Sequence, residues 1–412
     1  MDEDEFEEEL EQSQPEENTL DKNYKIWKKN APYLYDILIT WDLKVTSLCV
    51  NWVPKVGYTN ESLYLQKLIL GTFSNGQEND YLIVAKTRLP NALAINTNKD
   101  IKDNNQDQSR EEKCKVEIET KIRHDGEINK AKIMPQNLDD ACLIATKANN
   151  GEVRIFDYFK FKSTDEIAIP TIILNGQTEV GYGLSWNPIQ KGLILSSSYD
   201  HSVCLWDIND KNKGNDNDKG KVCCPITTYN EHEKECEDVC FSKNDCNLFV
   251  SCGDDKAIKI YDKRADRSMN SIIGHDAEIN SIDMNPVCEF LYITGSSDKT
   301  VALWDLRKPE IKLHSFNYHK DAITNVKWNP RLGNIFASAG EDNKVLIWDL
   351  TQIGEAKLDN EEAPNEMIFE HGGHLDKIND IDWNLLENMM LASVDNANIL
   401  HIWEMNTNNI FK

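Results

Sequence analysis

Long apolar runs are missing from this 412-residue sequence. No stretch reaches the roughly 18 consecutive apolar residues that a membrane-spanning helix needs. The opening residues, MDEDEFEEELEQ, also lack the positive and then apolar pattern of a secretory signal peptide. These shortages exclude membrane and secreted classes and predict a protein of the nucleus, with the cytoplasm as a second location.

Positive charge is the next shortage. The chain has 45 Lys and Arg against 70 Asp and Glu, a formal net charge of −25. So acidic a protein is repelled by nucleic acids and anionic membranes and attracted to basic proteins. We therefore expect no membrane partner and no direct nucleic-acid binding, although solubility alone also explains the charge. Residues 1–17 hold ten acids and no base, which predicts a disordered acidic tail.

Motifs for catalysis are missing as well. The sequence contains no Gly-rich phosphate loop and no nucleophile elbow around a Ser. Most of the 11 cysteines lie in apolar strand patterns, where a reducing compartment makes them small buried hydrophobes. Cys236 and Cys240 come nearest to a zinc motif, but the second close pair of ligands is missing. We expect no enzyme activity, no cofactor and no metal; a zinc enzyme built on these cysteines is a minor alternative.

A repeat is what the sequence does have. Similar stretches read SSSYDHSVCLWD (196–207), SCGDDKAIKIYD (251–262), SSDKTVALWD (296–305) and SAGEDNKVLIWD (338–349). The units end at Asp157, Asp207, Asp262, Asp305, Asp349 and Glu404, and the shorter spacings match a four-stranded propeller blade. Strands expected over residues 45–90 supply a seventh unit, completed by mixing N- and C-terminal segments. The sequence thus predicts an all-β, seven-bladed WD-repeat β-propeller.

A second pattern runs through the repeat. A His lies 23 residues before an Asp, and an aromatic residue follows that Asp by 6, in the sets His232–Asp255–Tyr261, His275–Asp298–Trp304 and His319–Asp342–Trp348. Because the pair recurs in successive blades, we interpret it as a hydrogen-bonded network that locks each blade and not as a catalytic site. Degenerate copies have Gln177 for His, Phe156 for Trp, and Ala397 for the Asp between His374 and Trp403.

A helix is predicted ahead of the propeller. Thr19 or Asp21 can cap it, Pro32 predicts its end near Asn30, and its apolar stripe is Leu20, Tyr24, Trp27, Ala31 and Leu34. We assign residues 18–36 to this helix and its exit, and 37–412 to the propeller. Polar insertion loops are expected at about 96–113, 209–222 and 352–366.

Two surfaces of such a fold could bind a basic partner. The insertion 352–366 is acidic and precedes the apolar Met367-Ile368-Phe369, a combination that suits a basic amphipathic helix. The segments leading into the first strand of each blade place Glu and Asn around one rim of the central channel, where a basic extended peptide could lie. A solvated loop and ordinary rim polarity are the plainer interpretations.

The sequence resembles the retinoblastoma-binding, Msi-type histone-binding WD-repeat family, which includes the small subunit of chromatin assembly factor. The likeness runs from about residue 20 to about residue 404 and is carried by NYKIWKKNAPYLYD (23–36), HDGEINKAKIMPQN (124–137), GYGLSWNP (181–188), GSSDKTVALWDLR (295–307), LHSFNYHKDAI (313–323) and HGGHLDKINDIDWN (371–384). It implies a non-enzymatic histone chaperone or adaptor with the N-terminal helix packed on the side of the propeller. Implied partners are histones H-four and H-three and subunits of chromatin assembly, deacetylase, acetyltransferase, remodelling or methyltransferase complexes. A general WD-repeat scaffold, such as a ubiquitin-ligase substrate receptor, is the alternative.

The resemblance also implies two sites. The first helix of histone H-four is expected in a groove at Tyr24, Ile26, Trp27, Leu34, Asp359, Glu362, Ile368 and Phe369. A histone H-three tail or a co-repressor peptide is expected at the channel rim, at Glu127, Asn129, Tyr182, Glu237 and Asn280. The sequence departs from the family at Pro364-Asn365, where a Pro-Pro is usual, and at rim positions Val180, Ala322 and Asn396, where acids are usual. We therefore expect weaker or altered tail binding at the rim.

Overall fold

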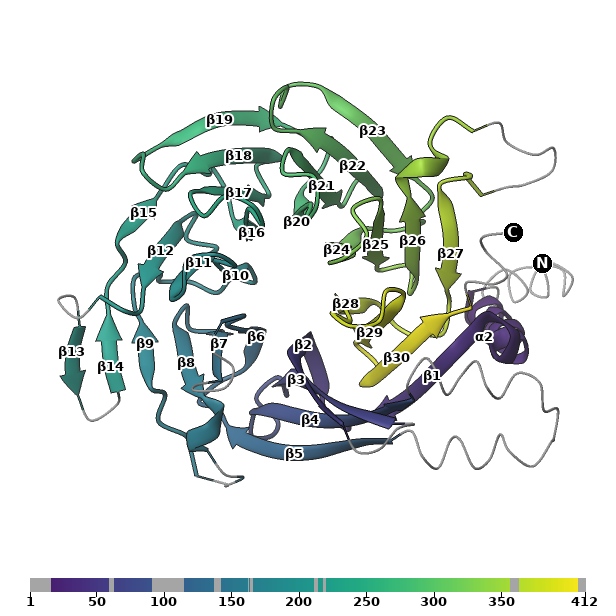
Figure 1. Cartoon of the computed structure of the whole chain (residues 1–412), viewed down its shortest axis with the longest axis horizontal. Coiled ribbons are helices and arrows are strands. Elements are labelled where there is room, and N and C mark those ends of the chain that lie inside the picture. Colours follow the sequence, from purple (N-terminus) through teal and green to yellow (C-terminus); the bar gives the residue numbers. More distant parts are fainter. Residues whose placement is uncertain are drawn as a thin grey trace, which may run out of the picture.

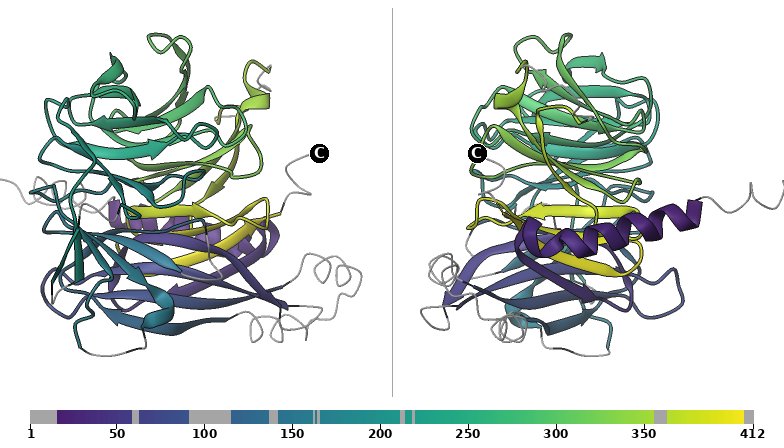
Figure 2. Two further views of the ribbon diagram at one scale, coloured as in Figure 1. Left: turned by 60° about the vertical axis from the view of Figure 1, so that its left-hand side comes forward. Right: turned by 90° about the vertical axis from the view of Figure 1, so that its right-hand side faces the viewer.

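Seven β-sheets surround a central channel, and one long helix lies along the side of the ring (Figures 1 and 2). This computed structural model describes residues 16–58, 63–90, 115–136, 142–161, 163, 166–210, 214–217, 220–355 and 363–406. The predicted seven-bladed propeller is confirmed. Within the described ranges, no helix is long and apolar enough to cross a membrane.

Each blade presents its first strand to the channel and adds further strands outward. Blade 1 has β2 (Thr46–Tyr58), β3 (Leu63–Phe73), β4 (Tyr81–Pro90) and β5 (Lys115–Arg123); blade 2 has β6 (Ile128–Ile133), β7 (Leu143–Ala148), β8 (Val153–Asp157) and β9 (Ile172–Leu174). Blade 3 has β10 (Leu184–Trp186), β11 (Leu193–Ser197), β12 (Val203–Asp207) and β15 (Thr227–Tyr229). The 3₁₀ turns are η1 (Tyr158–Lys160) and η2 (Leu350–Gln352).

The second half of the ring repeats this order. Blade 4 has β16 (Cys236–Phe241), β17 (Leu248–Gly253), β18 (Ala257–Asp262) and β19 (Ser268–Ile273); blade 5 has β20 (Ile279–Met284), β21 (Leu291–Ser296), β22 (Thr300–Asp305) and β23 (Lys312–Asn317). Blade 6 has β24 (Ile323–Trp328), β25 (Ile335–Gly340), β26 (Val345–Asp349) and β27 (Met367–His371). Blade 7 has β28 (Ile378–Trp383), β29 (Met390–Asp395), β30 (Ile399–Met405) and, outermost, β1 (Tyr35–Asp42).

The ring closes in blade 7, where β1 pairs antiparallel with β30 (Figure 1). In this pairing Leu38 lies opposite Trp403, and Thr40 lies opposite His401. Mixing of N- and C-terminal strands was expected in the sheet of residues 45–90, and that expectation is wrong, because β2 to β5 form blade 1 from consecutive strands. Pairing the two ends of the propeller removes the free sheet edges that an open ring would expose.

The insertion expected as a polar loop at 209–222 contains a hairpin. Strands β13 (Gly214–Asn217) and β14 (Gly220–Cys223) pair with each other, and β14 extends the sheet of blade 2 by pairing parallel with β9. A loop was predicted because the segment has no apolar alternation, but an outer strand can be held by its backbone hydrogen bonds alone. The insertion at 96–113 and the tail at 1–15 lie outside the described residues.

The His–Asp networks are present as predicted. In blade 5, the ring of His275 contacts the carboxylate of Asp298 at 2.8 Å and the hydroxyl of Thr294 at 2.8 Å. The indole of Trp304 donates to the same hydroxyl at 2.8 Å, so every member of the network has a partner.

The network of blade 7 is complete, contrary to the degeneracy expected at Ala397. His374 contacts Asp395 at 2.9 Å and Ser393 at 2.7 Å, and Trp403 donates to Ser393 at 3.2 Å. The carboxylate comes from a position two residues before Ala397, at the end of β29. A search at one fixed offset therefore missed it.

Helix α2 (Glu16–Leu34) begins earlier and ends later than predicted, and it contains Pro32 in its last turn. The missing amide of Pro32 leaves a carbonyl one turn earlier without its usual donor, on a residue that faces solvent. Ala31 and Tyr35, in contrast, are buried among residues of blades 6 and 7. This packing outweighs the local preference for a break at the proline.

Candidate functional site

A shallow hollow of about 310 Å³ separates the C-terminal end of α2 from strand β27. Residues from three separate segments line it: Tyr33, Leu34, Met367, Ile368, Phe369, Glu370 and Asn406. Three of the predicted groove residues, Leu34, Ile368 and Phe369, are thus brought together from opposite ends of the chain. The floor is largely apolar and carries one acid, Glu370.

The other predicted helix residues lie differently. Trp27 faces the propeller: its indole stacks parallel to the ring of His401, with centroids 6.0 Å apart, and its Nε1 donates to the hydroxyl of Tyr35. Tyr24 stacks on Trp27, with centroids 5.5 Å apart. Ile26 is 60% exposed and does not line the hollow. Trp27 and Tyr24 therefore fix the helix in place, and Leu34 is the helix residue that faces the hollow.

Phe369 is 8% exposed and packs edge-on against Tyr35 and nearly parallel to Trp403. The apolar surface open at this site is thus smaller than the residue types alone suggest. Tyr33, which is 74% exposed, was not identified from the sequence. The signal available for it was its position next to Leu34 in the last turn of the helix.

The predicted acids Asp359 and Glu362 lie outside the described residues. The described ends of their insertion meet beside the hollow, since the Asn365 side chain donates to the carbonyl of Glu355 at 3.1 Å. Nearby, Glu366 contacts the ring of His314 at 3.2 Å and immediately precedes β27. The segment that carries the acids therefore leaves and re-enters the fold next to the first residue of the strand that floors the hollow.

The second predicted site, at the channel rim, has a common structural origin. Asn129, Glu237 and Asn280 each stand at a register shift of their inner strand, so each is the extra residue of a β-bulge. Tyr182 lies two residues before the short inner strand β10. A bulge re-aims the side chain of its extra residue, and the repeat places these residues at one end of the channel in successive blades.

Their accessibility differs. Asn129 is 1% exposed and donates to the carbonyl of Gly181 at 3.3 Å, so its amide is used inside the fold. Asn280 donates to the carbonyl of Ile323 at 2.7 Å. Tyr182 is 37% exposed, and Glu127 accepts from the amide of Asn149 at 3.2 Å. Tyr182 is therefore the most open of the rim residues identified from the sequence.

Glu237 is the most perturbed acid of the rim. Burial raises its pKa to about 7, the hydrogen bond from Tyr199 opposes that rise, and the charges of Asp254, Asp238 and Glu235 add to it. Burial also raises the pKa of Tyr182, followed by the charges of Glu237 and Glu127. The sequence analysis missed Tyr199 as a partner of Glu237, because the two come from different blades.

Potential metal ligands gather at one place in the described part of the chain. The ring nitrogens of His371, His374 and His401 lie within 4.8 Å of one another. These imidazoles already make hydrogen bonds: both nitrogens of His371 have partners, and His374 belongs to the blade 7 network. Cys236 and Cys240 are buried free thiols. We therefore assign the His cluster to the core that supports α2.

Fold and repeat together define the class: the protein is a WD-repeat β-propeller. A family model for the WD domain, G-beta repeat, matches residues 170–207, 223–262, 267–305 and 311–349. A second model, which describes the histone-binding protein RBBP4 and the corresponding subunit of the CAF1 complex, matches residues 22–91. This range includes most of α2, β1 and the first three strands of blade 1. The two models together match more than half of the chain, and the protein belongs to this histone-binding WD-repeat family.

Proposed function

We propose that this protein is a nuclear histone-binding chaperone or adaptor that holds the first helix of histone H-four at the hollow between α2 and β27. One observation carries the proposal. Leu34, Ile368 and the edge of Phe369 form an apolar floor at the place where the acidic insertion joins the fold. The matched family model supports it, because that model covers α2 and is described as a histone-binding protein.

The proposed mechanism is binding without bond-making. An amphipathic helix lays its apolar face on the floor, and its Arg and Lys side chains meet carboxylates at the edge. Asp359 and Glu362 supply two of these carboxylates. Glu370, which forms an ion pair with Lys344 at 2.7 Å, is the described acid of the hollow. Trp27 contributes indirectly by fixing the helix that presents Leu34.

Charge reversal in the insertion tests the groove. We expect the double variant Asp359→Lys with Glu362→Lys to lose binding to a peptide of the first histone H-four helix, measured by isothermal titration calorimetry. The matched control, Glu289→Lys with Glu310→Lys, makes the same change in charge at two exposed acids of blade 5 and should bind as the parent does. Equal binding by the two double variants would overturn the groove assignment.

We also propose that the channel rim holds a basic tail of histone H-three or of a co-repressor, with lower affinity than the groove holds its helix. Glu127, Glu237 and Tyr182 are the side chains best placed to receive it. Because Val180, Ala322 and Thr324 carry no charge, the acidic part of the rim is confined to blades 2, 4 and 5. Titration with a histone H-three tail peptide tests this hypothesis, and submicromolar binding would contradict it.

A further inference from the structure

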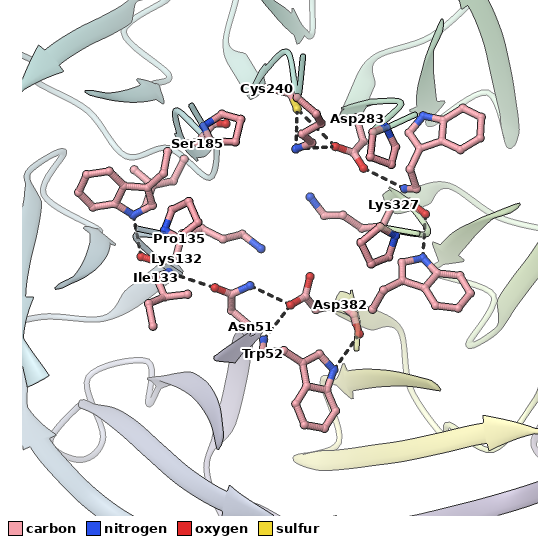
Figure 3. Close-up of a pocket in the computed structure, with 18 of the residues that line it drawn as sticks. Asn51, Trp52, Lys132, Ile133, Pro135, Ser185, Cys240, Asp283, Lys327 and Asp382 are labelled. Carbon is pink, nitrogen blue, oxygen red and sulfur yellow. Dashed lines mark hydrogen bonds and ion pairs between the residues drawn. The ribbon is translucent and has the colours of Figure 1, made fainter. Parts of the chain in front are cut away.

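The channel mouth opposite the rim is built from one repeated position of the inner strands. Seven side chains, one from each blade, form a ring there: Asn51, Lys132, Ser185, Cys240, Asp283, Lys327 and Asp382 (Figure 3). They surround a hollow of about 330 Å³ at the C-terminal ends of the inner strands, whereas the rim residues lie at the N-terminal ends. This mouth and the rim are therefore separate surfaces.

The edge of the mouth is rigid and apolar. Prolines stand three residues after the ring position in five of the seven blades: Pro54, Pro135, Pro188, Pro286 and Pro330. Exposed apolar side chains continue outward from them, with Val287 63% exposed, Ile189 51% exposed and Leu386 39% exposed. A fixed apolar edge around a concave site is typical of peptide- and ligand-binding surfaces.

A polar network closes the channel just below this hollow. The ammonium of Lys130, from blade 2, lies 2.9 Å from the carboxylate of Asp380, from blade 7. The amide of Asn325, from blade 6, donates to the same carboxylate at 2.8 Å. The three side chains link different sides of the channel and separate the hollow from the rim.

Every carboxylate around the hollow already has a donor. Asp382 accepts from the Asn51 amide and from the backbone of Trp52, each at 2.8 Å. Asp283 accepts from the backbone of Trp328 at 2.8 Å and lies 3.4 Å from the ammonium of Lys243.

Asp238, the remaining acid of the lining, accepts from the Ser281 hydroxyl and from the backbone of Ile282, each at 3.2 Å. With Lys130 and Lys243 paired, two cations of the lining are left over. Neither the ammonium of Lys132 nor that of Lys327 has a hydrogen-bond or ion-pair partner among the residues that the structure describes.

Both ammoniums point into the open centre of the ring (Figure 3). Their backbones are held: the indole of Trp186 donates to the carbonyl of Lys132 at 2.9 Å, and that of Trp383 donates to the carbonyl of Lys327 at 3.0 Å. Burial, and then the charge of Lys327, lowers the pKa of Lys132. Two cations facing each other without an anion between them form a site that an anion would stabilise.

We propose that this mouth binds an acidic, apolar peptide segment of a partner protein, with a carboxylate between Lys132 and Lys327 and apolar side chains on the proline edge. The charge preference is the reverse of that proposed for the groove and the rim, both of which take basic segments. A partner held here would leave both histone sites open. The mouth would then connect the histone-binding protein to other members of an assembly.

A defined peptide tests the proposal. The probe is a fluorescein-labelled hexapeptide, Gly-Ser-Leu-Phe-Leu-Glu with a free C-terminus, and its partner probe is the C-terminally amidated form with Gln in place of Glu, which has no carboxylate. Fluorescence anisotropy with the full chain should show at least about tenfold tighter binding of the acidic probe, since hydrogen bonds to charged groups contribute that much. No binding at millimolar concentrations, or equal binding of both probes, would overturn the proposal.

Two variants locate the binding. Lys132→Met with Lys327→Met keeps the length of the side chains and should abolish the difference between the probes. The control, Lys22→Met with Lys28→Met, removes the same charge from the exposed face of α2 and should keep it. If the first variant fails to fold, Val287→Asp at the exposed edge of the mouth should weaken the acidic probe by about tenfold. A preference that survives these changes would place the binding elsewhere and overturn the assignment.

An internal acid and a terminal one share this chemistry, and two further probes separate them. One keeps Glu but is amidated at its C-terminus, and the other has Gln and a free C-terminus. Whichever of them retains the preference for the parent over the Lys132→Met with Lys327→Met variant identifies the carboxylate that enters the mouth.

Discussion

The indole Nε1 of Trp27 donates a hydrogen bond to the hydroxyl of Tyr35 at 2.8 Å. Because the indole can only donate, the hydroxyl is free to donate to Nδ1 of His371, 2.6 Å away, and Nε2 of His371 lies 3.0 Å from Nδ1 of His401. Burial lowers the pKa of both histidines well below the usual range, which keeps them neutral. The direction of every hydrogen bond in this chain is thereby determined, and it attaches α2 to blades 6 and 7.

Replacing Trp27 with Ala should detach the helix. We expect the free energy of unfolding to fall by about 2 kcal/mol or more, because the variant loses a large aromatic contact and leaves Tyr35 without its donor. Chemical denaturation measures this change. The matched control is Ile26→Ala on the exposed face, expected to stay within about 0.5 kcal/mol of the parent. Equal losses in the two variants would contradict the docking role of Trp27.

The blade 7 network predicts that Asp395→Asn destabilises the protein by about 2 to 4 kcal/mol, since the fully buried carboxylate supports His374. Thermal and denaturant unfolding would measure it. The complementary variant, Ala397→Asp, restores the sequence pattern of the other blades but should not stabilise the protein, because Asp395 already fills the position. A gain in stability from Ala397→Asp would show that the assignment of Asp395 is wrong.

Glu237 predicts a pH dependence of stability. Its pKa is raised from 4.5 to about 7 in the folded protein, so between these values the unfolded chain releases a proton that the folded chain retains. The contribution of Glu237 to stability is therefore present below about pH 4.5, falls as the pH rises to about 7, and then stays constant.

The variant Glu237→Gln should lack this contribution and gain stability relative to the parent at pH 8, with little difference at pH 4.5. Denaturant titrations of both proteins at the two pH values measure the change. A difference in stability that does not depend on pH would contradict the raised pKa.

At the hollow, Leu34→Arg should weaken binding of the histone H-four helix by at least about tenfold, because it places a charge on the apolar floor and repels the basic ligand. The variant Ile26→Arg adds the same side chain to α2 at a residue that does not line the hollow, and it should weaken binding less. Calorimetric titration of both variants makes the comparison. A larger loss from Ile26→Arg would place the ligand higher on the helix than we propose.

Much of the fold follows from local patterns. A blade needs strands that alternate, tight turns and a repeated polar network, and each of these leaves a mark at short range in the sequence. Spacings such as that between His275 and Asp298 were therefore sufficient to predict the propeller and its locks. The apolar stripe of the helix likewise predicted which side of α2 faces the ring.

Other features depended on contacts between distant parts of the chain. The pairing of β1 with β30, the burial of Asn129, the place of Asp395 and the inward turn of Trp27 each arise from neighbours far away in sequence. No local pattern distinguishes Leu34, which faces the hollow, from Trp27, which faces the core. Only the packed ring decides which side chains remain exposed.

The sequence by itself determined the number of blades, the elements of each blade and the segments that do not repeat, because backbone periodicity is a local property. The tertiary structure decided which residues of those segments meet. It brought Leu34 to Ile368 beside the acidic insertion, and it left Lys132 and Lys327 facing each other across the channel. These relationships depend on closing the ring, since each joins residues from segments that come together only in the folded propeller.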